Sequence, residues 1–526
     1  MGVYLNPGDD LFGKSFRSPI YIDKSMIIDY LNKVIDTEMR FVCVSRPRRF
    51  GKSMAAHMIS AYYDRSTTAQ EKFAQLKIAR VPSYTEHLGK YDVIKLNVQS
   101  FLSRSDNSID NVLNNIQKRL LQELCLEYEN VHFFNADDLV EVMLDIYNNT
   151  KRLFIIIVDE WDCIFREYAG RKDWQDKYLD FLRAWWKDQP YIGLVYMTGI
   201  LPIKKYGTHS ALNMFTEFSM TDAGALAEFV GFTEPEVRAL CDEYNMNFDE
   251  CKTWYDGYYF GEVGSVYNPR SVVQSMMSHK YNTYWNQTET FEALKVYISL
   301  NTDGLKDAII ALMAGDRQII DTGKFVNDMV TFNGKDDVLT LLVHLGYLGY
   351  DFATSTVFIP NQEIRREYAN ATDDKDWGTV AKAVRASNSL LEATLVADAQ
   401  TVAEGIKAAH LETSHITYND ENALAYTISL AYYTARNKYM VVREFPAGKG
   451  FADMVFLPRP QYMGQIPALV LELKWNKSAK AAIQQIKNKE YPHSLTDYCG
   501  SVLLVGINYD KTTREHECEI EKFTKV

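Results

Sequence analysis

The stretch Phe41-Val-Cys-Val-Ser45 is followed at once by Arg46-Pro-Arg-Arg-Phe-Gly-Lys-Ser53. The short apolar run predicts a buried strand, and Met54 to Tyr63 predicts a helix. A loop between a strand and a helix binds phosphate through backbone N–H groups, a lysine, and a Ser or Thr that ligates Mg²⁺. Gly51, Lys52 and Ser53 supply the glycine of the loop, the lysine and the hydroxyl group. We therefore predict a nucleotide-phosphate loop here; the alternative is a basic turn.

A second stretch, Gly8 to Ser15, fits the Gly-x-x-x-x-Gly-Lys-Ser/Thr spacing letter for letter. No apolar strand precedes it, and Pro19 follows where a helix should begin. The two aspartates inside it would also repel phosphate. The structural context of such a motif carries more weight than its spelling. We therefore prefer the loop at 46–53, although Arg46 stands where the pattern asks for its first glycine.

Three further apolar runs predict strands, at Tyr91–Val98, Leu153–Val158 and Tyr191–Met197, and Asn107–Tyr128 predicts a long helix. Continuous apolar strands are typical of parallel sheets that are covered by helices on both faces. Strands that alternate with helices indicate a doubly wound α/β domain, whose ligands bind at the carboxyl ends of the strands. The residues that directly follow such strand ends are Lys52 (after its loop), Asp159 and Thr198.

The acidic residues after the 153–158 strand suit magnesium-assisted hydrolysis of a phosphoanhydride. We expect Asp159 to hold Mg²⁺ together with Ser53, and Glu160 to polarise the attacking water. Asp162 adds negative charge without an assigned role. Thr198 is a candidate polar sensor of the γ-phosphate. The alternatives are an acidic strand tip exposed to solvent and a threonine that caps a turn.

From about residue 215 the alternation of strands and helices stops. Short helices are predicted within 221–254, followed by the aromatic turn Trp254-Tyr-Asp-Gly-Tyr258. Residues 285–370 are predicted to be mostly helical, and a Leu-rich helix at 336–348 precedes two short β stretches. This order favours a winged-helix module, with a helical spacer as the alternative. The polar segment 370–376 predicts a linker.

A second group of chemical residues lies near the C-terminus. Asp453 stands within a strand pattern, and Glu472 and Lys474 follow on a second apolar strand. Because they are two residues apart, Glu472 and Lys474 project from one face of that strand. Two carboxylates that bind Mg²⁺ beside an ammonium group form a site for phosphodiester hydrolysis. The alternative is an exposed strand face with cross-strand ion pairs.

Two predicted helices flank this second group. The first, at 419–433, carries Glu421, whose carboxylate could reach the same metal ion. The second, from residue 480 to 491, carries Gln485, Lys487 and Tyr491, which are suited to contact a phosphate backbone.

The composition is that of an ordinary globular chain of 526 residues, long enough for about three domains. The formal charge of −12 argues against a surface covered with nucleic acid but allows one basic groove. Seven cysteines occur without a Cys-x-x-Cys pair, which favours reduced thiols in the cytoplasm. The N-terminus has no signal-peptide pattern, and no apolar run is long enough to span a membrane. We therefore expect a cytoplasmic protein without a membrane partner.

The sequence resembles a bacterial and archaeal family that joins an N-terminal AAA-ATPase-like domain to a C-terminal PD-(D/E)XK nuclease-superfamily domain. The resemblance covers nearly the whole chain and rests on Tyr21–Ser25, 45–53, 158–162, 197–200, 254–258, 452–453, 472–474 and 485–491. It implies that the whole string Arg46, Pro47, Arg48, Arg49, Phe50, Gly51, Lys52 and Ser53 is a family form of the nucleotide loop. It also implies that Asp453, Glu472 and Lys474 form the nuclease core, with Glu421 as its upstream acid and Gln485 on its trailing helix.

We therefore expect an α/β protein with four parts: a P-loop ATPase domain at 1–215, a helical lid with the aromatic turn at 216–284, a winged-helix-like module at 285–372, and a restriction-endonuclease-like domain at 373–526. The expected function is an ATPase, using ATP and Mg²⁺, coupled to a magnesium-dependent nuclease that acts on nucleic acid, with DNA favoured, in defence or mobile-element biology. The alternative is a non-catalytic ATP-driven switch that only binds nucleic acid or a protein. The sequence leaves open whether the chain forms a homo-oligomer.

Overall fold

The computed structural model describes residues 2–104, 108–203, 212–285, 290–300, 304–327, 329, 331–372, 378–412, 424–425, 427–428, 431–447, 450–459, 462–491, 495 and 501–523. Internal contacts divide the chain into two compact units. The first holds Met1–Leu305 and Ile319–Glu367, and the second holds Lys306–Gln318 and Tyr368–Val526. The boundary near residue 367 lies just before the linker predicted at 370–376. Within the described ranges, we find no helix that is long and apolar enough to cross a membrane.

The first unit is built on a five-stranded parallel sheet with the order β2-β3-β4-β1-β5. Its strands are β1 (Phe41–Ser45), β2 (Asp92–Asn97), β3 (Phe154–Asp159), β4 (Ile192–Gly199) and β5 (Thr216–Phe218). The parallel α/β sheet is as predicted. Because β4 lies between β1 and β3, the end of β4 separates the phosphate loop from the acidic strand end.

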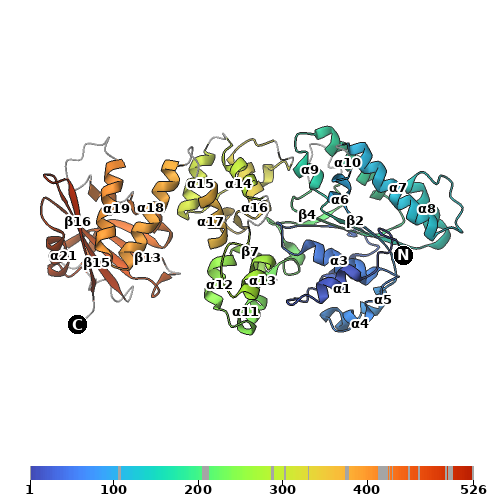
Figure 1. Cartoon of the computed structure of the whole chain (residues 1–526), viewed down its shortest axis with the longest axis horizontal. Coiled ribbons are helices and arrows are strands. Elements are labelled where there is room, and N and C mark those ends of the chain that lie inside the picture. Colours follow the sequence, from blue (N-terminus) through green and yellow to red (C-terminus); the bar gives the residue numbers. More distant parts are fainter. Residues whose placement is uncertain are drawn as a thin grey trace. The chain divides into compact units, whose positions relative to one another are not determined.

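Helices cover both faces of this sheet (Figure 1). Helix α3 packs against β2, β3 and β4 on one face. The opposite face is covered by α7, α8 and α10. The helices of this region are α1 (Asp10–Phe16), α2 (Ile27–Val34), α3 (Lys52–Tyr63), α4 (Gln70–Phe73), α5 (Tyr84–His87), α6 (Val98–Leu102), α7 (Ile109–Glu127), α8 (Leu139–Thr150), α9 (Cys163–Glu167) and α10 (Lys172–Trp186).

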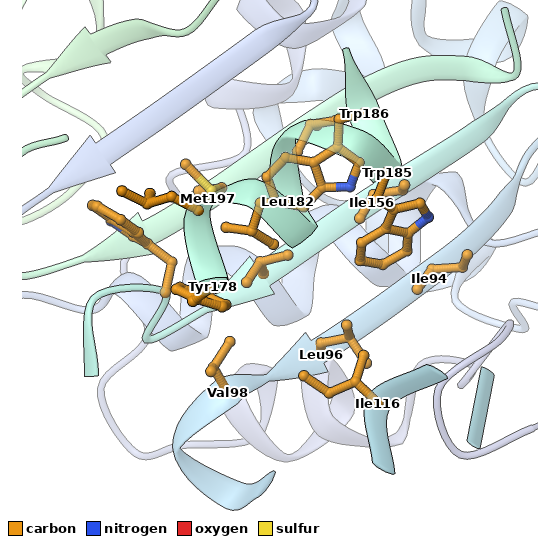
Figure 2. Packing of buried hydrophobic residues seen from close by; sticks show 14 of the residues in the cluster. Ile94, Leu96, Val98, Ile116, Ile156, Tyr178, Leu182, Trp185, Trp186 and Met197 are labelled. Atoms are coloured by element: carbon orange, nitrogen blue, oxygen red, sulfur yellow. The ribbon is translucent and has the colours of Figure 1, made fainter. Parts of the chain in front are cut away.

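The core between the sheet and the second helical layer is rich in aromatic residues. Figure 2 shows Trp185, Trp186 and Tyr178 of α10 lying over Ile156 of β3 and Met197 of β4. These side chains are almost completely buried. Burial of large apolar side chains stabilises a fold by about 1.5–3 kcal/mol each. The packing therefore holds β3 and β4, which carry the acidic and threonine ends, in a fixed register.

The rest of the first unit consists of short helices and small antiparallel sheets. Strands β6 (Phe232–Thr233), β7 (Tyr258–Phe260) and β8 (Gly264–Tyr267) form one sheet in the order β6-β8-β7, and β10 (Gly349–Asp351) pairs with β11 (Thr356–Phe358), next to β9 (Gln318–Ile319). The helices are α11 (Glu234–Glu243), α12 (Phe248–Tyr255), α13 (Pro269–Ser278), α14 (Thr290–Ile298), α16 (Lys335–Leu345) and the first turns of α17 (Gln362–Ala371). A helix followed by the β10–β11 hairpin matches the predicted order of elements. Its identification as a winged helix stays a prediction.

The second unit contains a mixed sheet in the order β12-β13-β14-β15-β16. Only the β14–β15 pair is parallel, and α21 connects these two strands. The strands are β12 (Tyr439–Ala447), β13 (Gly450–Pro458), β14 (Ala468–Trp475), β15 (Val502–Asp510) and β16 (Glu515–Phe523). The helices are α15 (Leu305–Ala314), α18 (Gly378–Leu395), α19 (Ala399–Glu412) and α21 (Ala479–Asn488).

The two faces of this sheet belong to different cores. Leu471 and Leu473 of β14 face the core that includes α18 and α19, whereas Val470 faces the core below α21. Because side chains alternate along a strand, Glu472 and Lys474 project to the α21 face, as predicted. The α21 face therefore carries the candidate nuclease residues.

His516 on β16 lies in an aromatic cluster on the other face. Its ring centroid is 5.1 Å from that of His410 and 4.8 Å from that of Tyr509. The side chain is buried, and neither ring nitrogen has a hydrogen-bond partner among the described residues. Burial, and then the neighbouring His410 and Lys407, lower the pKa of His516 to about 4, whereas Glu515 opposes this shift.

We expect the stability that neutral His516 contributes to the second unit to decrease as the pH falls from about 6.5, the ordinary histidine pKa, towards 4. Over this range the unfolded chain binds a proton at His516 that the folded chain does not, so stability rises with pH. Thermal unfolding at pH 7 and pH 5 measures the effect. His516→Phe should reduce the difference between the two midpoints, whereas the exposed control His132→Phe should leave it unchanged. An equal pH dependence in all three proteins would contradict this assignment.

Candidate functional site

The loop between β1 and α3 has the geometry of a phosphate loop. Gly51 adopts a left-handed conformation with φ of 92° at the residue before α3, where a side chain would be strained. Lys52 begins the helix and is buried. Its Nζ donates to the carbonyl oxygens of Arg46 (2.9 Å) and Pro47 (2.8 Å), so it lies inside the loop. Burial lowers the pKa of Lys52, and the charges of Glu160 and Asp159 oppose this shift.

The side chain of Arg46 has a structural role in the loop, and the predicted contact of this residue with the nucleotide stays a prediction. It is fully buried behind the loop, where its guanidinium donates to the carbonyl oxygens of Ser45 and Phe218 and lies 4.8 Å from the ring centre of Phe260. Burial lowers the pKa of Arg46 to about 10. The side chain therefore anchors the loop to β5 and β7, and only the backbone of this residue faces Lys52. A buried anchor explains why arginine replaces the first glycine of the motif.

Other side chains of the loop also pack against the middle region. The Phe50 ring meets that of Tyr258 edge-on at 5.3 Å. The Tyr258 hydroxyl donates to Gly346 O at 2.6 Å, and a Cβ at Gly346 would lie 2.8 Å from Pro47. The aromatic turn at 254–258 therefore holds the phosphate loop from behind. Arg48 and Arg49 line a cavity beside the loop, together with residues 50–53.

The acidic end of β3 lies next to the end of β4. Thr198 donates its hydroxyl hydrogen to Asp159 Oδ1, and the same oxygen accepts from the backbone N of Glu160 at 3.1 Å. Thr198 is buried, so it acts on the site through Asp159. Its predicted role as a γ-phosphate sensor stays a prediction. Because both bonds end on Oδ1, they leave Oδ2 of Asp159 to other partners.

Arg166 is a site residue that the sequence pattern did not reveal. It pairs with Glu160 through NH2 and with Asp162 Oδ2 through Nε at 3.1 Å. Burial raises the pKa of Glu160, while the charges of Lys52 and Arg166 oppose this shift. An arginine four residues after an acidic residue matches no sequence motif, so the sequence alone does not identify Arg166 as a site residue. Only the turn after β3, in which Glu160 adopts a φ of 55°, brings the two side chains together.

Asp162, which had no predicted role, is a structural residue. Its Oδ2 accepts the backbone N–H groups of Ile200 (3.0 Å) and Leu201 (2.9 Å), directly after β4. The carboxylate is completely buried. It therefore fixes the turn after β3 against the end of β4.

We expect Gly199→Ala to destabilise the protein by about 1–3 kcal/mol, as overpacking of a core does. A Cβ at this position would lie 2.6 Å from Trp161 Nε1 and 2.8 Å from Asp162 Oδ1, inside the buried turn. Thermal unfolding measures the loss. Gly170→Ala is the matched control, because a Cβ there has nothing within 4 Å. Equal midpoints for the two variants would contradict the tight fit.

A cavity of about 900 Å³ opens beside the loop. Its lining includes the charged side chains Lys52, Glu160 and Arg166. It also includes apolar side chains such as Phe229 and Val273. The remaining lining residues include Ser18, Ile20, Tyr21, Ile22, Lys24, Ser53, Met54, Met58, Asn97, Phe232 and Arg270. A cavity lined by both cationic and apolar side chains suits a molecule that combines phosphates with an aromatic base.

The rejected motif copy has a different structure. Residues Asp10–Phe16 form α1, so Lys14 lies in the last turn of a helix and not in a phosphate loop. Lys14 is exposed, and Asp9 pairs with Lys72 at 2.8 Å. Residues 8–15 therefore match the motif in sequence but do not form a phosphate loop.

The second group of predicted residues meets where β13 and β14 separate. The two strands pair through residues 454–456 and 469–471, and beyond these pairs Asp453 Oδ2 accepts from the backbone N of Leu473 at 2.7 Å. Opposite, Glu444 has a φ of 49° and interrupts the pairing of β12 with β13. The charge of Asp453 acts on Glu472, so the two carboxylates lie near each other.

Glu472 is the central side chain at the place where β13 and β14 separate. Its Oε1 accepts from Lys474 Nζ at 3.0 Å and from Gln485 Nε2, whereas its buried Oε2 has no hydrogen-bond partner among the described residues. Burial and the nearby charge of Asp453 raise the pKa of Glu472 to about 7. Burial also raises the pKa of Asp453. Two carboxylates that repel each other, one with an unpartnered buried oxygen, suit a divalent cation.

The three predicted nucleic-acid contacts lie on α21 or just after it, and they are placed differently from expectation. Gln485 bonds Glu472, so it orients the carboxylate. Lys487 pairs with Glu521 at 2.5 Å at the surface. Tyr491 is 1 % exposed, and its hydroxyl donates to Phe451 O at 2.6 Å. Tyr491 is therefore a core residue, which corrects its predicted contact with phosphate.

Glu421, the predicted upstream acid, lies outside the described residues. Within the described ranges, no group of three or more His, Cys, Asp and Glu side chains is placed to hold a metal ion. The described part of the metal site thus consists of Asp453 and Glu472.

The parallel sheet, the phosphate loop and the acidic strand end give the first unit the fold of a P-loop ATPase-like domain. Residues 16–208 match the family model described as a predicted AAA-ATPase, and residues 420–519 match that of the PD-(D/E)XK nuclease superfamily. The chain therefore joins an AAA-ATPase-like domain to a PD-(D/E)XK nuclease-superfamily domain, as its motifs predict.

Three solved structures are similar to this chain at low identity. The Walker-type ATPase PABY2304 of Pyrococcus abyssi is 12% identical with a TM-score of 0.32, and the match covers 66% of this chain and 94% of that one. The ORC2 protein of Aeropyrum pernix, in its ADPNP and ADP complexes, is 13% identical with a TM-score of 0.30 (72% and 98% covered). The ORC1 protein of the same organism, in complex with DNA, is 12% identical with a TM-score of 0.24 (72% and 99% covered). No curated protein matches this chain.

Proposed function

We propose that the first unit binds and hydrolyses ATP. The observation that carries this proposal is the cavity of about 900 Å³ beside the loop, whose lining includes Lys52, Ser53 and Glu160. The backbone of the loop at 46–53 and the start of α3 favour bound phosphates, because helix N-termini attract anions. Lys52 would exchange its carbonyl partners for phosphate oxygens.

The residues present fit a magnesium ion at this site. Ser53 lines the cavity, and Asp159 keeps Oδ2 outside its bonds to Thr198 and Glu160. When bound, Mg²⁺ neutralises the charge that develops on the phosphates. Glu160 would orient the attacking water and accept its proton. Arg166 holds the Glu160 side chain, so their ion pair has to open or turn for Glu160 to reach the water.

We propose further that the second unit cleaves nucleic acid, DNA in the first instance, in a magnesium-dependent reaction. Asp453 and Glu472, with Glu421, would hold the metal ion, which supplies Lewis-acid activation of the phosphodiester when bound. Lys474 would stabilise negative charge on the scissile phosphate or hold the attacking water. Gln485 keeps Glu472 in place for this task. Nucleotide binding or hydrolysis would gate this reaction, which suits a role in defence or mobile-element biology.

A phosphate-release assay tests the proposed ATPase directly. We expect the purified full chain to release phosphate from ATP in the presence of Mg²⁺ and to stop when the ion is removed with EDTA. Turnover should be compared with and without DNA, because a coupled pair of sites predicts that DNA changes the rate. If the chain binds ATP but never releases phosphate under these conditions, the proposed hydrolysis is wrong, whereas the proposed ATP binding still stands.

A further inference from the structure

Glu363, in the first turn of α17, is a buried carboxylate that joins separate segments of the first unit. Its Oε2 accepts the Ser271 hydroxyl at 2.8 Å, and its Oε1 accepts the backbone N–H groups of Tyr284 (2.6 Å) and Trp285 (2.9 Å). The side chain is 1 % exposed. The carboxylate thus holds the start of α13 and the segment at 284–285 together.

Both of these segments support an arginine that lines the nucleotide cavity. Arg49 of the phosphate loop donates through NH1 to Tyr284 O at 3.0 Å, so the peptide that Glu363 binds also binds Arg49. Arg270 precedes Ser271 in the first turn of α13 and lines the same cavity. Glu363 is therefore linked to Arg49 through the Tyr284–Trp285 peptide and to Arg270 through the neighbouring residue Ser271.

The charges of this region favour a polyanion in the cavity. Burial and the positive charges of Arg270 and Arg48 lower the pKa of Arg49, and the charge of Glu363 opposes this shift. A carboxylate behind Arg49, or a phosphate chain in front of it, would offset its repulsion by Arg270 and Arg48. Glu363 supplies the former from a position that does not line the cavity.

We propose that Glu363 is a positioning residue that holds Arg49 and Arg270 for the β- and γ-phosphates of the bound nucleotide. This inference rests on the proposed nucleotide site. It assigns a role to a residue of α17, more than 300 positions after the phosphate loop.

The test compares the dissociation constants of ATP and AMP by calorimetry for the full chain. Glu363→Ala removes the carboxylate, so we expect ATP binding to weaken about tenfold, whereas AMP, which lacks the outer phosphates, should change less than about twofold. Glu363→Gln keeps an acceptor oxygen for the backbone N–H groups and should retain part of the preference. Glu71→Ala, an exposed charge change on α4, is the matched control and should change neither constant.

The outcomes separate this inference from the proposed function. If Glu363→Ala weakens ATP and AMP equally, or changes neither, the positioning role is overturned. If the wild-type chain binds no ATP, or if Lys52→Ala leaves ATP binding unchanged, the nucleotide site itself is overturned. If Glu363→Ala does not fold, the variants Glu363→Gln and Ser271→Ala test the positioning role instead. Each of them removes only some of the hydrogen bonds of Glu363, so each is expected to fold. In these two variants an unchanged ratio of the AMP and ATP constants would contradict the proposal.

Discussion

Replacing Lys52 with Ala is expected to abolish ATP turnover, with a loss of about a hundredfold or more, the magnitude typical of removing one electrostatic contact to a transition state. Lys52 is a buried ammonium group at the start of α3, and its present partners are two carbonyl oxygens of its own loop. Phosphate oxygens are stronger acceptors for an ammonium group than neutral carbonyls. We therefore expect ATP binding to weaken as well. Phosphate release and calorimetry measure the two effects.

Lys14→Ala is the matched control for this experiment. Lys14 belongs to the motif copy with the better spelling, but it lies exposed in the last turn of α1. We expect this variant to bind and hydrolyse ATP like the wild type. Loss of binding in Lys14→Ala together with normal binding in Lys52→Ala would show that the wrong loop has been chosen.

Replacing Lys474 with Ala is expected to abolish magnesium-dependent cleavage of DNA, again by about a hundredfold or more. The ammonium group is buried and donates to Glu472 Oε1 at 3.0 Å, beside the predicted metal site. Asp453→Ala should have the same effect, because it removes one of the two described carboxylates. Gel electrophoresis of a labelled DNA after incubation with Mg²⁺ measures the cleavage.

Two control experiments accompany this second prediction. Lys480→Ala changes an exposed lysine on α21 and should leave cleavage unchanged. Circular dichroism should show that Lys474→Ala remains folded, since the substitution leaves Glu472 buried without its partner. Cleavage by Lys474→Ala at the wild-type rate would rule out the proposed role of this lysine.

The main parts of the first site could be predicted from the sequence because each is local. The apolar run of β1, the loop that follows it and the apolar run of β3 are continuous in the chain, and strand ends of a parallel sheet meet at one edge. The Asp453, Glu472 and Lys474 group was also predictable, because a period of two places side chains on one face of a strand.

The residues that the sequence did not reveal depend on the tertiary fold. Arg166 meets Glu160 through a tight turn, and Glu363 reaches the cavity through two backbone peptides far away in the chain. Arg46 was predicted at the nucleotide because it stands in the motif, whereas its guanidinium packs behind the loop on Phe260. Tyr491 was predicted at a phosphate because it is polar, yet its ring fills a core. No periodicity distinguishes a side chain that faces a ligand from one that faces a neighbouring element.

The central claim, that ATP at the loop around Lys52 controls a nuclease at Glu472 and Lys474, is tested most directly by one cleavage experiment. Single-stranded and double-stranded DNA and RNA are incubated with Mg²⁺ and the full chain, with ATP, with ADP and without nucleotide. We predict that the wild type cleaves at least one substrate to an extent that depends on the nucleotide, that Lys52→Ala loses this dependence, and that Lys474→Ala never cleaves. A wild-type protein that hydrolyses ATP but cleaves no nucleic acid under any of the three conditions would contradict the claim and favour the non-catalytic switch.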